Sequence, residues 1–169
     1  NELCEMIDEW RVSHKDYDLP QEVYDFVKEK GFFSFIIPKE YGGLEFSPLG
    51  LIYVMAKIGS RSGTLASMVG VPNSLGPAEL LMHYGTDEQK KELLPKLASG
   101  EHVPCFALTG PYAGSDATSM PDTGIVCKGD FEGEEIIGIK LNFSKRYITL
   151  APIATLIGLA FKMYDPDHL

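Results

Sequence analysis

The sequence is poor in basic charge and in cysteine, and both shortages argue against classes of function. Its 169 residues include 15 Lys and Arg against 24 Asp and Glu, which gives a formal net charge of −9. Such a charge repels phosphate backbones, so we expect no nucleic-acid partner. The three cysteines, Cys4, Cys105 and Cys127, are an odd number without metal-ligand spacing. They indicate a reducing compartment and no metal site.

Long apolar runs and nucleotide-binding glycine patterns are also missing. The best apolar run, Ile153 to Phe161, is far shorter than the roughly 20 residues that span a bilayer. With no charged-then-apolar leader in view, we expect a cytoplasmic protein, and peripheral association with the inner membrane stays open. No GxGxxG segment occurs, which argues against dinucleotide binding of the Rossmann kind.

Helix signals repeat through the first part of the chain. Pro20 and Gly31 bound one predicted helix. Its Val23, Phe26 and Val27 recur at helical spacing, so they form one apolar face.

Three more helices are predicted before the chain changes character near Gly100. Ser47 caps the first, which runs to about residue 59. Its core-facing stripe is predicted to be Leu51, Ile52, Met55 and Ile58. The second runs from residue 73 or 74 to 84, and Thr86 begins the third with Gln89 as capping-box partner.

After Gly100 the sequence is richer in β-branched residues and in turns. The predicted strands are residues 103–108, 124–128, 136–143, 147–149 and 155–163. Gly129-Asp130 and Glu132-Gly133-Glu134 are the predicted hairpin turn segments. Helices first and strands second predict an α+β fold, not a doubly wound sheet.

Four segments occur together in the order and spacing of one enzyme family. They are PKEYGG at 38–43, GTDEQKKELLPKLASGE at 85–101, CFALTGPYAGSD at 105–116 and KRYITLAPIA at 145–154. The chain resembles the acyl-CoA dehydrogenases. The stretches PDTGIVCKG at 121–129 and KRYITLAPIATLIGLAF at 145–161 are most similar to the large bacterial members that act in fatty-acid β-oxidation.

The resemblance implies a domain organisation and a set of binding partners. Residues 1–101 would form an N-terminal helical domain, and residues 102–169 part of an antiparallel, β-barrel-like middle domain. The implied cofactor is FAD, the substrate a fatty acyl-CoA and the electron acceptor an electron-transfer flavoprotein. The complete enzyme would be a homo-oligomer.

The same resemblance names the residues that would contact FAD. They are Phe106, Leu108, Thr109, Gly114, Ser115, Tyr147, Ile148 and Thr149. Thr109 would supply a hydroxyl and an N–H to the redox-active edge, since a reduced flavin is an anion that needs donors. Gly114 and Ser115 suit phosphate, because successive N–H groups near glycine can form an anion-binding nest. Ser115 would also face the acyl-CoA, and the Tyr147 ring would lie against the isoalloxazine.

Several positions depart from the family pattern. Gly110 stands where many relatives have an acidic residue, and Tyr112 where glycine or an acidic residue is usual. Lys145 and Arg146 are interpreted as anchors of a strand end or a phosphate. In the family that the chain resembles, the catalytic glutamate comes from a C-terminal helical bundle that these residues do not include, so no catalytic base is assigned here and the 169 residues alone are expected to be inactive.

Other functions stay open at this point. The same scaffold serves acyl-CoA oxidases and flavin monooxygenases, which differ in how the reduced flavin reacts with oxygen. A noncatalytic acyl-CoA- or protein-binding module would bind ligand without flavin.

Overall fold

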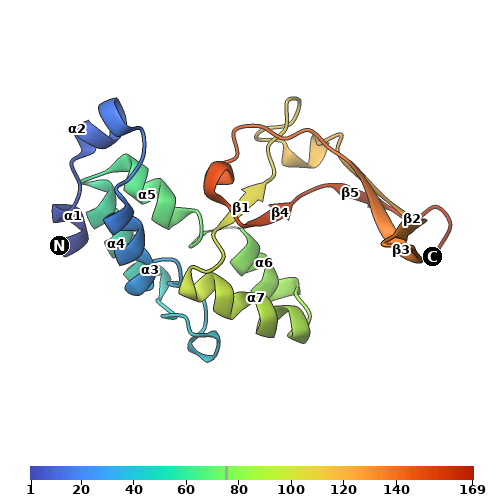
Figure 1. The fold of residues 1–169 in the computed structure, drawn as a ribbon, viewed down its shortest axis with the longest axis horizontal. Coiled ribbons are helices and arrows are strands. Elements are labelled where there is room, and N and C mark those ends of the chain that lie inside the picture. Colours follow the sequence, from blue (N-terminus) through green and yellow to red (C-terminus); the bar gives the residue numbers. More distant parts are fainter. Residues whose placement is uncertain (75) are drawn as a thin grey trace. The chain divides into compact units, whose positions relative to one another are not determined.

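The computed structural model describes residues 1–74 and 76–169 and has the predicted α+β class (Figure 1). The helices are α1 (Glu2–Glu5), α2 (Glu9–Arg11), α3 (Gln21–Glu29), α4 (Pro48–Gly59), α5 (Gly63–Gly70), α6 (Pro77–Tyr84) and α7 (Asp87–Ser99). The strands are β1 (Pro104–Ala107), β2 (Thr123–Phe131), β3 (Glu134–Asn142), β4 (Leu156–Leu159) and β5 (Lys162–Tyr164). A π-helical turn at Val12–Asp16 and 3-10 turns at Lys39–Tyr41, Ala117–Ser119 and Ala151–Ile153 complete the order.

The chain forms two compact units. Unit 1 comprises residues 1–105 and 149–157, and unit 2 comprises residues 106–148 and 158–169. The first passage between the units thus falls inside β1, close to the predicted domain boundary at residues 101 and 102. That boundary stays a prediction.

The predicted N-cap of α4 is confirmed, and its predicted apolar face is wrong at Ile52. The Ser47 hydroxyl accepts the N–H of Gly50 at 3.2 Å, which begins the helix where the sequence indicates. Ile58 is buried in the core of unit 1 and Met55 packs against that core. Ile52 is 62% exposed, so the face that α4 buries includes fewer apolar residues than the sequence predicts.

The helix α7 has the predicted capping box. Gln89 donates its N–H to the Thr86 hydroxyl at 3.3 Å, and its side-chain oxygen accepts the Thr86 N–H at 3.0 Å. The preceding helix, α6, begins later than predicted, at Pro77. The side chain of Asn73 instead bonds to backbone groups in the core of unit 1. Part of the predicted segment, Leu75, lies outside the described residues.

Asn73 joins two segments in the core of unit 1. Its side-chain oxygen accepts the N–H of Phe35 at 2.8 Å. Its amide nitrogen donates to the carbonyls of Phe32 at 2.6 Å and Val69 at 2.8 Å. The residue is 3% exposed, so these bonds replace water that the buried backbone cannot reach.

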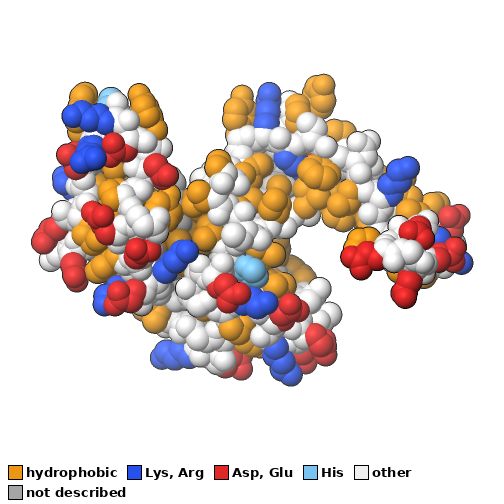
Figure 2. Space-filling model, viewed as in Figure 1, with side chains coloured by type: hydrophobic (Ala, Val, Ile, Leu, Met, Phe, Trp, Pro, Cys, Tyr) orange, Lys and Arg blue, Asp and Glu red, His pale blue; other side chains and the backbone are white. Residues whose placement is uncertain are grey.

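Unit 2 contains a long antiparallel hairpin of β2 and β3 (Figure 1). Its turn is Glu132–Gly133, with φ of 54° and 87°, the two positive angles of a hairpin turn that matches strand twist. Gly129, Asp130 and Glu134 are therefore strand residues, not turn residues as predicted. Acidic side chains gather at this end of the hairpin (Figure 2).

The remaining strands differ from the prediction in two ways. Residues 147–149 form no strand, because Tyr147 has a left-handed φ of 58°. The predicted strand 155–163 is divided into β4 and β5, since Ala160 donates its N–H to Ala107 whereas Lys162 donates to Asp122. β5 runs parallel to β2, so the sheet β3-β2-β5 is mixed where an antiparallel one was implied.

Among the described residues, no helix combines the length and the apolar character that crossing a membrane requires.

The bonds of Asn73 predict its contribution to stability. In Asn73→Ala the N–H of Phe35 and the carbonyl of Phe32 lose their partners. We expect the free energy of unfolding, measured in urea, to fall by about 3 kcal/mol, since each buried polar group left unpaired costs about 1–3 kcal/mol. Ser74→Ala, at the exposed neighbour, should change it by less than about 0.5 kcal/mol. Equal stabilities of the two variants would contradict this role.

Candidate functional site

The candidate site lies in unit 2, where the loop after β1 meets the segment after β3. β1 ends at Ala107, one residue before the predicted end of this strand, so the half-buried Thr109 lies in the loop that follows. The Thr109 carbonyl accepts the backbone N–H of Arg146 at 3.1 Å. This bond connects two segments that are far apart in the sequence.

A buried ion pair fixes the base of this connection. Lys145 Nζ lies 2.6 Å from Asp122 Oδ2, and the two side chains are 4% and 2% exposed. Lys145 Nζ also donates to the carbonyl of Leu108 at 2.9 Å. The Ser144 N–H donates to Asp122 Oδ1 at 2.8 Å. The hydrogen bond from Lys145 is the largest cause that lowers the pKa of Asp122, and the Ser144 N–H adds to it.

Arg146 makes the outer connection. Its Nη2 donates to the carbonyl of Pro111 at 3.2 Å. Its guanidinium carbon lies 4.9 Å from the centre of the Tyr147 ring, within the range of a cation–π contact. The Tyr147 side chain stands out from the surface and the residue is 82% exposed.

Gly110 shows why the loop departs from the usual family pattern. Its N–H donates to the carbonyl of Ala113 at 3.0 Å, which closes a tight turn. A Cβ at this position would lie 3.0 Å from the carbonyl oxygen of Ser144. An acidic side chain here would need Ser144 to move.

Several donors of the loop are free to bind a ligand. Within residues 1–74 and 76–169, the hydroxyl and N–H of Thr109 and the N–H groups of Gly114 and Ser115 have no hydrogen-bond partner. Gly114 and Ser115 are exposed. These unpaired donors fit an anionic or carbonyl-bearing ligand.

The structure brings together only some of the predicted contact residues. Leu108, Thr109 and Tyr147 meet through Lys145 and Arg146. Phe106 is half-buried on β1, and Ile148 is half-buried directly after Tyr147. Gly114 and Ser115 have no hydrogen bond to the second segment among the described residues, and the exposed Thr149 belongs to unit 1.

The role of Asp122 in this region was not predicted from the sequence. It occurs in the PDTGIVCKG stretch, where a lone acid between a proline and a threonine resembles ordinary turn chemistry. Its partner Lys145 follows only after the whole hairpin. The single sequence signal is a charged residue just before a strand.

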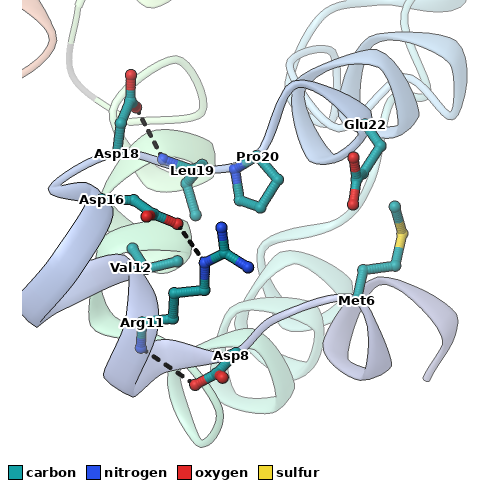
Figure 3. Close-up of a pocket in the computed structure, with 9 residues that line it drawn as sticks. All are labelled: Met6, Asp8, Arg11, Val12, Asp16, Asp18, Leu19, Pro20 and Glu22. Carbon is teal, nitrogen blue, oxygen red and sulfur yellow. Dashed lines mark hydrogen bonds and ion pairs between the residues drawn. The ribbon is translucent and has the colours of Figure 1, made fainter.

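A separate cavity of about 520 Å³ lies in unit 1 (Figure 3). It is lined by Met6, Asp8, Arg11, Val12, Asp16, Asp18, Leu19, Pro20 and Glu22. Arg11 Nε donates to Asp16 at 2.7 Å, and the Asp8 carboxylate accepts the Arg11 N–H at 3.1 Å. The Asp8 bond caps the start of α2, and the Arg11–Asp16 pair links that helix to the π-helical turn that follows it. No group of three His, Cys, Asp or Glu able to hold a metal occurs in the part of the chain that is described.

A family model described as "Acyl-CoA dehydrogenase, N-terminal domain" matches residues 1–101. The chain belongs to this family. The resemblance read from the four sequence motifs is thereby confirmed.

Two relatives and one solved structure extend the likeness into the strands. The acyl-CoA dehydrogenase of Bacillus subtilis is 31% identical over 93% of this chain and 39% of its own length. The caffeyl-CoA reductase–Etf complex subunit CarC of Acetobacterium woodii is 36% identical over 80% of this chain and 34% of its own. A Bacillus anthracis acyl-CoA dehydrogenase solved with FAD has a TM-score of 0.73 and 26% identity, covering 96% of this chain and 28% of that one. The chain thus spans well under half the length of these relatives.

The buried ion pair predicts a large loss of stability when one partner is neutralised. Asp122→Asn leaves the Lys145 ammonium buried without a counter-charge. We expect the free energy of unfolding in urea to fall by about 3 kcal/mol or more. Glu135→Gln is the control, because its exposed pair with Lys128 at 3.4 Å contributes at most about 1 kcal/mol. Similar losses in both variants would mean that burial of the Lys145–Asp122 pair has no special weight.

The lowered pKa of Asp122 predicts how stability depends on pH. The contribution of this carboxylate is fully present above its unfolded pKa of about 3.9, and it is lost as pH falls through the lower native value. The unfolding free energy of the wild type should therefore fall more steeply below about pH 5 than that of Asp122→Asn. Urea titrations from neutral pH downward measure both slopes, and parallel curves would refute the assignment.

Proposed function

We propose that the protein to which this chain belongs catalyses FAD-dependent α,β-dehydrogenation of a fatty acyl-CoA to the trans-2-enoyl-CoA, in fatty-acid β-oxidation. Family membership supports the reaction class. The observation that carries the proposal is the joining of loop 108–111 to residues 145–147 by Lys145 and Arg146. It brings together two segments that are implied to contact flavin.

The residues of the loop fit FAD. The free Thr109 hydroxyl and N–H can donate to the edge of the ring system, and the Gly114 and Ser115 N–H groups to its pyrophosphate. The exposed Tyr147 ring offers a flat apolar wall. The chemistry that bound FAD supplies is acceptance of the hydride from the substrate β-carbon.

We assign no catalytic base to these residues. The α-proton would pass to a carboxylate from a part of the protein beyond this chain, while the β-hydrogen leaves with its electron pair. Ser115, which is exposed in the loop after β1, would contact the acyl-CoA. On this basis the 169 residues alone would bind ligands and not turn over.

The proposal includes the wider setting of the enzyme. Its electrons would pass to an electron-transfer flavoprotein, which the Etf complex in the name of the Acetobacterium woodii relative supports. The complete enzyme would be a cytoplasmic homo-oligomer, with peripheral association with the inner membrane as a variant of that location.

A second candidate is the reverse reaction, reduction of a 2-enoyl thioester. The name of the same relative, a caffeyl-CoA reductase at 36% identity, favours it. The same donors and aromatic wall serve both directions, because the two reactions share one transition state. The direction is then decided by the electron partner.

Anaerobic visible spectroscopy of the whole protein tests the proposal. The purified protein should show a flavin band that bleaches when a long-chain acyl-CoA is added, because electrons leave the substrate for FAD. Bleaching by a reduced donor, with colour restored by an enoyl-CoA and none lost to acyl-CoA, would favour the reductase. If air is then admitted, rapid reoxidation of the reduced flavin by oxygen would indicate an oxidase or monooxygenase. A colourless protein that binds acyl-CoA would indicate a binding module.

A further inference from the structure

Arg146 is the residue at which the loop and the aromatic wall of the candidate site meet, through three contacts. Its backbone N–H donates to the Thr109 carbonyl at 3.1 Å, and its side chain donates to the Pro111 carbonyl at 3.2 Å. The same guanidinium lies over the Tyr147 ring at 4.9 Å. One side chain thus touches the loop and the aromatic wall at once.

The three contacts have different consequences. The bond to Thr109 uses the backbone, so any residue at 146 can make it. The bonds to Pro111 and to the ring use the planar guanidinium, which can donate in its plane while its face covers an aromatic ring. A lysine has a point charge without that plane. The side chain of Arg146 therefore couples the position of the loop to that of the ring.

Tyr147 depends on this coupling more than a core aromatic would. The residue is 82% exposed and its backbone is left-handed, with φ of 58°. The ring has few neighbours to hold it, and the left-handed region is costly for a residue of this size. The Arg146 guanidinium packs against the face of this ring.

We propose that Arg146 is a positioning residue, which holds the Tyr147 ring and the Pro111 loop in the arrangement that receives the flavin. The inference deepens the proposed function and rests on it. Lys145 and Arg146 then have different roles. The buried Lys145 stabilises the unit, whereas the exposed Arg146 orders the surface that the ligand meets.

The test compares the purified whole protein with Arg146→Met and Arg146→Lys. Lys128→Met is the matched control, because Lys128 is an exposed cation on β2 of the same unit and pairs only with Glu135 in the described contacts. Apoprotein is titrated with FAD and followed by flavin fluorescence. We expect the dissociation constant to rise about tenfold in Arg146→Met, from the loss of one hydrogen bond and one cation–π contact. Arg146→Lys should be intermediate, and Lys128→Met unchanged.

A second measurement needs no flavin. Amide hydrogen exchange of residues 108–113 should be faster in apo Arg146→Met than in the apo wild type. The melting temperatures should agree within about 3 °C, because an exposed side chain contributes little to global stability. These two results together separate positioning from a general loss of stability.

Three outcomes would overturn the proposal. FAD binding by Arg146→Met as tight as that of the wild type overturns it alone. A large drop in melting temperature in both Arg146 variants would assign the residue to stability. A wild-type protein that takes up no FAD would remove the proposed function together with this inference, and it is distinguished from the first outcome by the wild-type titration.

Discussion

The buried pair of Lys145 and Asp122 is the constraint on which the arrangement of unit 2 depends. Two charges withdrawn from water are tolerated only when each is paired and its other hydrogen-bonding positions are filled. Here the Leu108 carbonyl and the Ser144 N–H fill them. The end of β1, the start of β2 and the segment after β3 therefore meet at one point, and the Lys162 N–H, bonded to the Asp122 carbonyl, adds β5.

The surface of the site follows from this buried point. Once Ser144 is held, its carbonyl lies so near the Gly110 backbone that a side chain there is crowded. The loop turns tightly and leaves the Thr109, Gly114 and Ser115 donors without partners among the described residues. A rigid base with unpaired donors in the adjoining loop suits a binding site, because little conformational freedom is lost when a ligand binds.

What could be predicted from the sequence was local. The capping box of α7 and the Ser47 cap of α4 depend on residues three positions apart, so they are readable. The predicted hairpin turn was too wide: Gly129, Asp130 and Glu134 are strand residues, although glycine and acidic residues are also typical of turns. Exposure of Ile52 and the left-handed Tyr147 depend on distant neighbours that no local pattern encodes. The Lys145–Asp122 pair was missed for the same reason, and the contact roles of the eight candidate flavin residues stay predictions.

The return of residues 149–157 to unit 1 has a consequence for how the protein is made. Leu150 and Ile153 pack against one part of the core of that unit, and Leu156 against the other. A ribosome must therefore synthesise residues 106–148, the larger part of unit 2, before unit 1 can close. Until residues 149–157 are made, the helices of unit 1 expose apolar surface. Chaperone binding during translation should therefore be most persistent while residues 106–148 are synthesised.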